Sequence, residues 1–220
     1  CFGDTLQFSS SGLISYAWSP NLNINDTSIS NPLVYPINDI QYYLFGTDNN
    51  NCSNTDTIEI TVNDLPIISI SNDTSICFGD TAQLTANGGI SFLWLNSDSI
   101  NNVNINNPVI WPSQNSIYEV IVSGSNNCFD TAEISIQVFN LPSVNAGLDQ
   151  NICYGDTAQL SASGALNYNW TPNNNISSSS NPNIDAWPLD TTQYILTGTD
   201  LNQCSKSDTV FVYIWNLPNA

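Results

Sequence analysis

Positive charge is almost absent from this sequence of 220 residues. It contains one lysine, Lys206, and neither arginine nor histidine, against 19 acidic residues, so the formal net charge is -18. We expect no nucleic-acid partner, because almost nothing is available to neutralise phosphates. Catalytic designs that depend on histidine, arginine or a lysine–carboxylate pair are excluded for the same reason.

Methionine and long apolar runs are also absent. No apolar stretch approaches the roughly 18 residues that a membrane-spanning helix needs, so we expect no insertion into a membrane. The chain does not begin with methionine or with a signal segment, and we therefore expect it to be a piece of a longer mature polypeptide. Its 41% hydrophobic content is sufficient for folded cores.

What the sequence does contain is an internal repeat. The pentapeptide Cys-Phe-Gly-Asp-Thr, with tyrosine as second residue in the last copy, begins at Cys1, Cys77 and Cys153, and these equal separations define the repeat interval. A second cysteine keeps the same interval, at Cys52, Cys128 and Cys204. We predict three domains, at residues 1–66, 67–142 and 143–220. The first domain has no counterpart of residues 67–76, so we expect its initial strand to lie outside this sequence.

Each repeat has the pattern of a small β domain. Apolar residues alternate with polar ones, which predicts strands with one buried face, and turn residues separate the segments. In the middle repeat the expected strands are Ile67–Ile70, Thr81–Ala86, Phe92–Trp94, Val109–Trp111, Tyr118–Val122 and Ile134–Val138. No segment carries the apolar stripe of a helix. We predict an all-β chain in which each repeat forms two packed antiparallel sheets.

Aromatic residues occur in pairs on the third strand of each repeat. The pairs are Tyr16 and Trp18, Phe92 and Trp94, and Tyr168 and Trp170. A sugar-stacking platform is one interpretation, but the same-face spacing favours core packing between the sheets. Trp111, Trp187 and Trp215 lie at strand ends, where we expect partly exposed indoles that contact a neighbouring repeat, a sister filament or a glycan.

The motifs resemble a family of surface repeats. In the third repeat these motifs are Tyr168-Asn-Trp170-Thr-Pro172, Asn181-Pro182 and Tyr194-Ile-Leu-Thr-Gly-Thr-Asp200. The pattern is similar to the PKD-like and immunoglobulin-like repeats of giant surface and secreted proteins of gliding Bacteroidetes, although the middle repeat lacks the Trp-x-Pro and Gly-Thr-Asp elements. The resemblance implies a tandem array of three immunoglobulin/PKD-like sandwiches. It also implies an extracellular, cell-surface location and a spacer role in adhesins or in proteins exported by type IX secretion.

The six cysteines imply an oxidising compartment and three disulfides, because no histidine or Cys-x-x-Cys favours a zinc site. Two connectivities are open. Pairing within repeats would join Cys1 to Cys52, Cys77 to Cys128 and Cys153 to Cys204. In an immunoglobulin topology, however, these partners lie at opposite ends of the sandwich, about 20 Å apart, whereas bridged Cα atoms lie within roughly 7 Å. Pairing between neighbours would join Cys1 to Cys128 and Cys77 to Cys204, leaving Cys52 and Cys153 for further repeats. The geometry favours this second connectivity.

Acidic residues near the junctions suggest calcium as a ligand, since their oxygen atoms suit this cation. The candidates are Asp64, Asp73 and Asp80 at the first junction and Asp149 and Asp156 at the second. The competing interpretation is that these aspartates accept backbone hydrogen bonds in turns, as Asp commonly does.

An Asp-Thr pair followed by an aliphatic residue occurs twice in every repeat. The threonines are Thr5, Thr57, Thr81, Thr131, Thr157 and Thr209. The pair suits a turn that leads into a strand. The triplet is also similar to the O-glycosylation signal of the same bacterial group, and this resemblance implies sugars on these threonines.

Two functions are consistent with these observations. The favoured one is a structural segment, a stalk or filament of a large extracellular adhesin, whose partners are neighbouring repeats and sister chains. The alternative is an accessory module that binds surface glycans through Tyr35, Trp111 and Trp187. We expect no enzyme: a glycosidase needs two placed carboxylates, and all three glutamates, Glu59, Glu119 and Glu133, lie in strand patterns.

Overall fold

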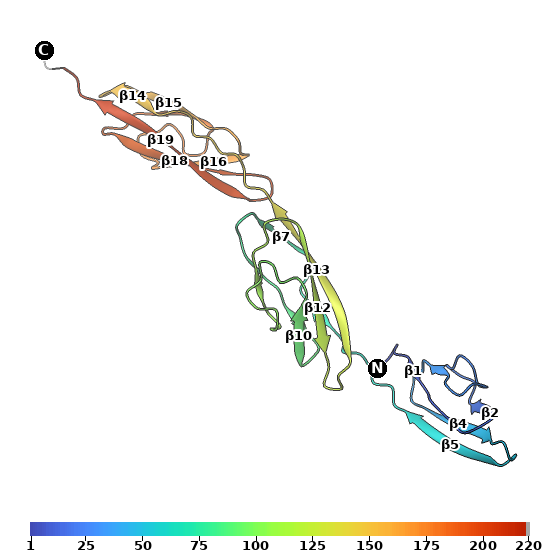
Figure 1. Cartoon of the computed structure of the whole chain (residues 1–220). Coiled ribbons are helices and arrows are strands. Elements are labelled where there is room, and N and C mark those ends of the chain that lie inside the picture. Colours follow the sequence, from blue (N-terminus) through green and yellow to red (C-terminus); the bar gives the residue numbers. More distant parts are fainter. Residues whose placement is uncertain (219–220) are drawn as a thin grey trace.

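The computed structural model describes residues 1–218, and the predicted all-β fold class is confirmed. Over these residues the chain forms nineteen strands and no helix. Figure 1 shows three successive lobes arranged end to end, with the N-terminus beside the junction of the first two lobes and the C-terminus at the far end. The chain is therefore a tandem array of immunoglobulin-like β-sandwiches.

The first repeat contains five strands, all paired antiparallel. They are β1 (Leu6–Gln7), β2 (Ser15–Ser19), β3 (Leu33–Val34), β4 (Ile40–Thr47) and β5 (Ser53–Ile60). A three-stranded sheet in the order β2-β4-β5 faces the pair β1-β3.

The middle repeat contains eight strands. They are β6 (Ser69–Ile70), β7 (Thr74–Cys77), β8 (Ala82–Gln83), β9 (Ala86–Asn87), β10 (Ser91–Trp94), β11 (Val109–Ile110), β12 (Ser116–Ser123) and β13 (Phe129–Phe139). One layer is a four-stranded sheet in the order β10-β12-β13-β7, and the other consists of the pairs β8-β11 and β6-β9.

The third repeat contains six strands in the same arrangement. They are β14 (Gln150–Cys153), β15 (Ala158–Ser161), β16 (Asn167–Thr171), β17 (Asn183–Ala186), β18 (Thr192–Thr199) and β19 (Ser205–Trp215). The four-stranded sheet has the order β14-β19-β18-β16, opposite the pair β15-β17.

Two strand pairings differ from the expected antiparallel sheets. Strand β7 pairs with β13 in parallel, and β14 pairs with β19 in parallel. The first two strands of the middle repeat lie in different layers, β6 in one and β7 in the other. The Asp73 carboxylate, between these strands, accepts a 2.8 Å hydrogen bond from the backbone N–H of Ser135 on β13. The chain thus crosses to the other layer without reversing direction, which makes the new pairing parallel.

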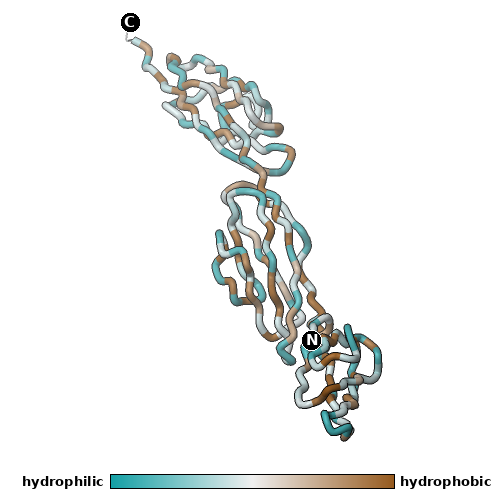
Figure 2. Tube along the Cα trace, turned by 45° about the vertical axis from the view of Figure 1, so that its right-hand side comes forward, coloured by the Kyte–Doolittle hydropathy of each residue, from teal (hydrophilic) through white to brown (hydrophobic). Residues whose placement is uncertain are grey.

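Each repeat has its own hydrophobic core. The three clusters contain Trp18, Trp94 and Trp170, which are buried, with Tyr16, Phe92 and Tyr168 packed against them half-buried. Each indole N–H donates to a backbone carbonyl at 2.9–3.1 Å, with Ile29, Ile105 and Asn181 as the acceptors. Hydrophobic and hydrophilic residues alternate along the strands of every lobe (Figure 2), as a two-residue period requires.

A second buried aromatic residue, a tyrosine, also recurs in every core. Tyr42, Tyr118 and Tyr194 are fully buried. Tyr42 donates its hydroxyl to the carbonyl of Leu22 (2.7 Å) and Tyr118 to that of Asp98 (3.2 Å). In the part of the chain that the structure describes, the Tyr194 hydroxyl has no partner. Burial raises the pKa of all three phenols above their ordinary value.

The first repeat is less enclosed than the other two. Within the described residues its main sheet has three strands, so β5 has no neighbour corresponding to β7 or β14. As a result Ile58 on β5 is 39% exposed, whereas Ile134 and Val210, one and two repeat intervals later, are fully buried.

Candidate functional site: the junctions between repeats

Two disulfides join neighbouring repeats. Cys1 is bonded to Cys128, with Cα atoms 5.6 Å apart, and Cys77 to Cys204, with Cα atoms 5.5 Å apart. Both bonds span 127 residues of sequence. The structure thus has the connectivity between neighbours, and the alternative connectivity within repeats is wrong. Two disulfides form over residues 1–218 instead of three, and Cys52 and Cys153 are unpaired and exposed.

Strand β13 explains why cysteines of one repeat do not bond to each other. Cys77, at the end of β7, lies opposite Phe139, the last residue of β13. Cys128 directly precedes Phe129, the first residue of that strand. The 11 residues of β13 span about 33 Å, far more than a disulfide can bridge. The same separation puts each cysteine close to the adjacent repeat.

The first cysteine of each repeat lies in a tight turn with one geometry. At Cys77 the carbonyl accepts the backbone N–H of Asp80 at 3.0 Å, and the N–H of Phe78 donates to Phe139 at 2.8 Å. Gly79 adopts φ 93°, which a residue with a Cβ rarely does. The glycine of the Cys-x-Gly-Asp-Thr motif is therefore required to close this turn.

The second cysteine of each repeat follows a hairpin turn between two long strands. In the middle repeat, the N–H of Gly124 donates to the carbonyl of Cys128 at 2.8 Å, and Asn127 has a positive φ of 63°. The Asn126 side-chain oxygen accepts the N–H of Cys128 at 3.1 Å. Asparagine tolerates the left-handed conformation better than most residues, which suits it to this turn.

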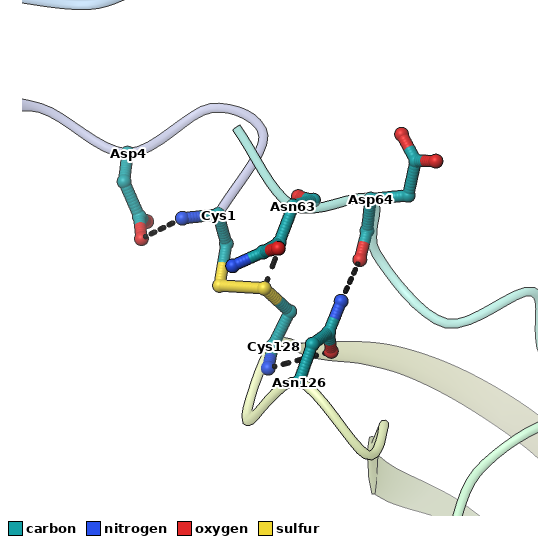
Figure 3. The surroundings of a disulfide bond; sticks show 6 residues. All are labelled: Cys1, Asp4, Asn63, Asp64, Asn126 and Cys128. Carbon is teal, nitrogen blue, oxygen red and sulfur yellow. Dashed lines mark hydrogen bonds and ion pairs between the residues drawn. A yellow bond between two sulfur atoms is a disulfide. The ribbon is translucent and has the colours of Figure 1, made fainter. Parts of the chain in front are cut away.

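The first junction also has polar contacts (Figure 3). The side-chain amide of Asn126 donates to the carbonyl of Asp64 in the linker at 2.8 Å. The Sγ atom of Cys128 lies 3.8 Å from the carbonyl oxygen of Asn63. A hydrogen bond therefore connects the hairpin turn of the middle repeat to the linker, beside the covalent bond.

Three grooves contain few side chains that could take part in catalysis. One of about 880 Å³ lies between β7, β12 and β13 and contains the single carboxylate of Asp73. Grooves of about 440 and 330 Å³ at the two junctions contain Asp64 and Asp80, again one carboxylate each. A two-carboxylate glycosidase mechanism has no pair to use in these grooves.

The structure does not bring three of the predicted calcium ligands together. Over residues 1–218 no group of three or more acidic or thiol side chains is placed to hold a metal ion, and this includes Asp64, Asp73 and Asp80. A site at Asp149 and Asp156 stays a prediction. The carboxylate of Asp149 accepts the N–H of Phe211 at 2.8 Å, which matches the role of Asp73 one repeat earlier. Calcium binding itself stays a prediction, to be tested by melting with and without a chelator.

The threonines predicted to carry sugars are all exposed: Thr5, Thr57, Thr81, Thr131, Thr157 and Thr209. The turn expected at every Asp-Thr pair is wrong for Asp56–Thr57 and Asp130–Thr131, which lie within strands β5 and β13. In both pairs the aspartate accepts the N–H of the threonine that follows it, at 2.8 Å. These bonds leave the threonine hydroxyls available for modification.

A half-exposed aromatic ring occupies one corresponding position in every repeat. Tyr35, Trp111 and Trp187 are 45%, 46% and 42% exposed. Their backbone N–H groups donate at 2.9 Å to the carbonyls of Asn23, Ser99 and Asn175, respectively. The rings therefore form a regular series held by the same local geometry, at three separate places rather than in one pocket.

The sequence left the role of two aspartates open and did not reveal one junction residue. Asp73 and Asp149 were considered both as calcium ligands and as acceptors of backbone hydrogen bonds, and the structure shows the second role: each carboxylate bonds the last strand of its repeat. The two aspartates lie one repeat interval apart, as do their partners Ser135 and Phe211, and this shared spacing was the available signal. Asn126 was missed altogether, because nothing in the sequence connects it to Asp64.

No protein-family model matches the chain, and no curated protein matches it. Among solved structures, an I-band fragment of titin is 11% identical, with a TM-score of 0.41 over 97% of this chain and 94% of the fragment. Extracellular domains 3–5 of Drosophila OTK are 11% identical, with a TM-score of 0.35 over 97% and 92%. The insect immune protein hemolin is 12% identical, with a TM-score of 0.38 over 97% and 72%. Such distant likenesses carry no information on what this chain binds.

Across residues 1–218, no helix has the length and apolar character to span a membrane.

Proposed function

We propose that this chain is a structural repeat segment, a stalk or filament of a large extracellular bacterial adhesin or fibre protein. The observation that carries the proposal is the overlap of the two disulfides. Cys1–Cys128 and Cys77–Cys204 both span the segment from residue 77 to residue 128, so the three repeats are interlocked. The mechanical role follows from this arrangement, and no reactive centre is needed for it.

The overlap shortens the covalent path along the array. The shortest route from Cys1 to Cys204 crosses to Cys128, returns along the chain to Cys77 and crosses again. Fully extended, the stretch of chain between Cys77 and Cys128 spans about 180 Å. Without the disulfides the path runs through every residue from Cys1 to Cys204, which spans about 730 Å. A stapled chain therefore resists lengthening even if its domains unfold.

An extracellular, cell-surface location agrees with this chemistry. Disulfides persist in oxidising environments and are rare in the cytosol. The exposure of all six threonines that follow an aspartate supports O-glycosylation of the same surface. The proposal also includes what the motif resemblance implies, namely that the repeats are of the kind found in surface proteins of gliding Bacteroidetes and in proteins exported by type IX secretion. Comparing the intact mass of native material with the mass of the bare sequence tests the glycosylation.

Small-angle X-ray scattering tests the structural role. The oxidised chain is expected to scatter as one extended particle of constant shape. The double variant Cys1→Ser with Cys77→Ser removes both inter-repeat disulfides and leaves the three hydrophobic cores unchanged. It should show a broader range of angles between the repeats. A matched control is Cys52→Ser, which removes a thiol but no disulfide and should scatter like the parent. If the parent were as flexible as the double variant, the spacer role would lose its support.

The second candidate function is binding of surface glycans. The observation in its favour is the series of half-exposed rings at Tyr35, Trp111 and Trp187, since aromatic faces stack on apolar faces of sugars. A glycan array probed with the whole chain tests it. Binding that weakens in Trp111→Ala and Trp187→Ala, but not in the control Trp215→Ala, would favour this module over the stalk.

A further inference from the structure

Cys52 and Cys153 are the two unpaired cysteines among the described residues, and both are exposed. They occupy the positions that form the disulfides elsewhere in the chain. Cys52 precedes the bonded Cys128 by one repeat interval, and Cys153 follows the bonded Cys77 by one interval. Figure 1 shows the β4–β5 turn and the end of β14 at opposite ends of the array.

The turn at Cys153 already has the geometry of its bonded counterpart. The N–H of Asp156 donates to the carbonyl of Cys153 at 3.0 Å, as Asp80 does to Cys77. Tyr154 donates its N–H to the last residue of the final strand, Trp215, at 2.9 Å, in the place where Phe78 bonds Phe139. Gly155 has φ 94°, against 93° for Gly79. The absence of a bond at Cys153 has not altered its turn.

The turn at Cys52 likewise matches the turn at the bonded Cys204. The N–H of Cys52 donates to the Asp48 carboxylate at 2.9 Å, and the N–H of Cys204 donates to that of Asp200 at the same distance. The carbonyl of each cysteine accepts a backbone N–H at 3.0 Å. Asn51 has φ 62° and Gln203 has φ 66°. Both halves of a junction are thus preformed, one at each end of the array.

The symmetry of the junction extends beyond the three repeats. Each disulfide joins the first cysteine of one repeat to the second cysteine of the next, so the interface is heterologous and does not close on itself. By the same separation of 127 residues, the partner of Cys153 would lie beyond the third repeat. The residue three repeat intervals before that partner position is Cys52, so Cys52 of a second copy is its equivalent.

We infer that Cys52 and Cys153 are the open halves of further junctions, each forming a disulfide with the complementary cysteine turn of another repeat of this kind. The inference deepens the proposed stalk function and rests on it. The partner turn comes either from a second copy of this chain or from a further repeat of the same polypeptide, and the chemistry is identical in the two cases. Repeats then continue end to end with one staple at every junction.

Bond formation requires an oxidant, and a disulfide such as oxidised glutathione is sufficient. The Cys153 thiolate attacks one sulfur of the oxidant, forming a mixed disulfide and releasing one glutathione thiolate. The Cys52 thiolate of the neighbour then displaces the second glutathione. Two thiols and one glutathione disulfide thus give one inter-repeat disulfide and two reduced glutathione molecules.

The test oxidises the purified whole chain in a buffer of reduced and oxidised glutathione and examines it on non-reducing gels. We expect a ladder of multimers whose cross-link maps to Cys52–Cys153. Because the chain has one lysine and no arginine, peptides are prepared with chymotrypsin rather than trypsin. Cys52→Ser and Cys153→Ser each lose the ladder, and their mixture forms a dimer and nothing larger.

A second arm distinguishes the source of the partner turn. A chain extended after Pro218 by a further copy of residues 67–142 is expected to bond Cys153 to the added counterpart of Cys128. If the extended chain forms this bond while separate chains stay monomeric, the partner is a repeat of the same polypeptide. Cys52–Cys52 or Cys153–Cys153 cross-links in random proportion, or free thiols in both arms, would overturn the inference. Scattering of the monomer still reports on the stalk function in that event.

Discussion

Cys128 is bonded to Cys1, which lies 127 residues earlier in the preceding repeat, and not to Cys77 of its own repeat. The physical cause is the length of β13, which separates Cys77 from Cys128 by the whole height of the sandwich. The bond therefore does not brace a single core, as a disulfide between the sheets would. It fixes the position of one repeat relative to the next.

The three core tyrosines provide a matched series for measuring a buried hydrogen bond. Tyr42→Phe and Tyr118→Phe each remove a hydroxyl that bonds a carbonyl, so we expect each to destabilise its repeat by about 1 kcal/mol. Tyr194→Phe removes a buried hydroxyl that has no partner in the described structure and should be neutral or stabilising. Hydrogen exchange read separately for each repeat gives the three free energies. Equal losses at all three positions would contradict this account.

Three glycines at corresponding positions provide a second series. An added Cβ at Gly88 would collide with the carbonyl of Ile67, and at Gly164 with that of Ser143. At Gly12 it would meet nothing within 4 Å. All three have positive φ, so Gly12→Ala is expected to cost about 1–2 kcal/mol from backbone conformation alone.

Gly88→Ala and Gly164→Ala should each lower the free energy of unfolding by roughly 1–3 kcal/mol more than Gly12→Ala, because the backbone must move to relieve the overlap of the new Cβ with a carbonyl. Denaturation followed by the fluorescence of the core tryptophans measures this difference. If Gly12→Ala lowers the free energy of unfolding as much as Gly88→Ala, the collision with the carbonyl of Ile67 is not what makes Gly88 necessary.

The hairpin turn at Cys52 is expected to loosen in acid. Hydrogen bonds from the N–H groups of Cys52 and then Asn50 lower the pKa of Asp48 from its usual 3.8. A carboxyl with a depressed pKa in the folded state stabilises the fold above the usual pKa, and this contribution is lost as the pH falls through the lowered value. Exchange of the Cys52 amide should therefore accelerate below about pH 4. The matched control is Cys128, whose turn has Gly124 in place of Asp48 and should show no such acceleration.

The sequence predicted the repeat interval, the strands and the connectivity between neighbours from simple rules. Alternation identified β12 and β13, and the expected distance between the cysteines of one sandwich argued against pairing within a repeat. The division of the first strand into β6 and β7 was not predictable in this way, because strands of two and four residues carry too few alternations to show which layer they join. The parallel pairing follows from that crossover.

The roles of the acidic residues were harder to predict than the fold. An aspartate in a turn has the same appearance in sequence whether its carboxylate binds a cation or a backbone N–H. Asp73 and Asp149 do the latter, at Ser135 and Phe211. The distinction depends on which strand lies opposite, and a single repeat does not reveal this.

Pulling a single chain by its two ends tests the central claim most directly. The account predicts that the oxidised chain, even after its domains unfold, extends between Cys1 and Cys204 by no more than the stretch from Cys77 to Cys128, about 180 Å. After reduction, or in the double variant Cys1→Ser with Cys77→Ser, the distance should reach about 730 Å. An oxidised chain that lengthens as far as the reduced one would show that the repeats are not interlocked.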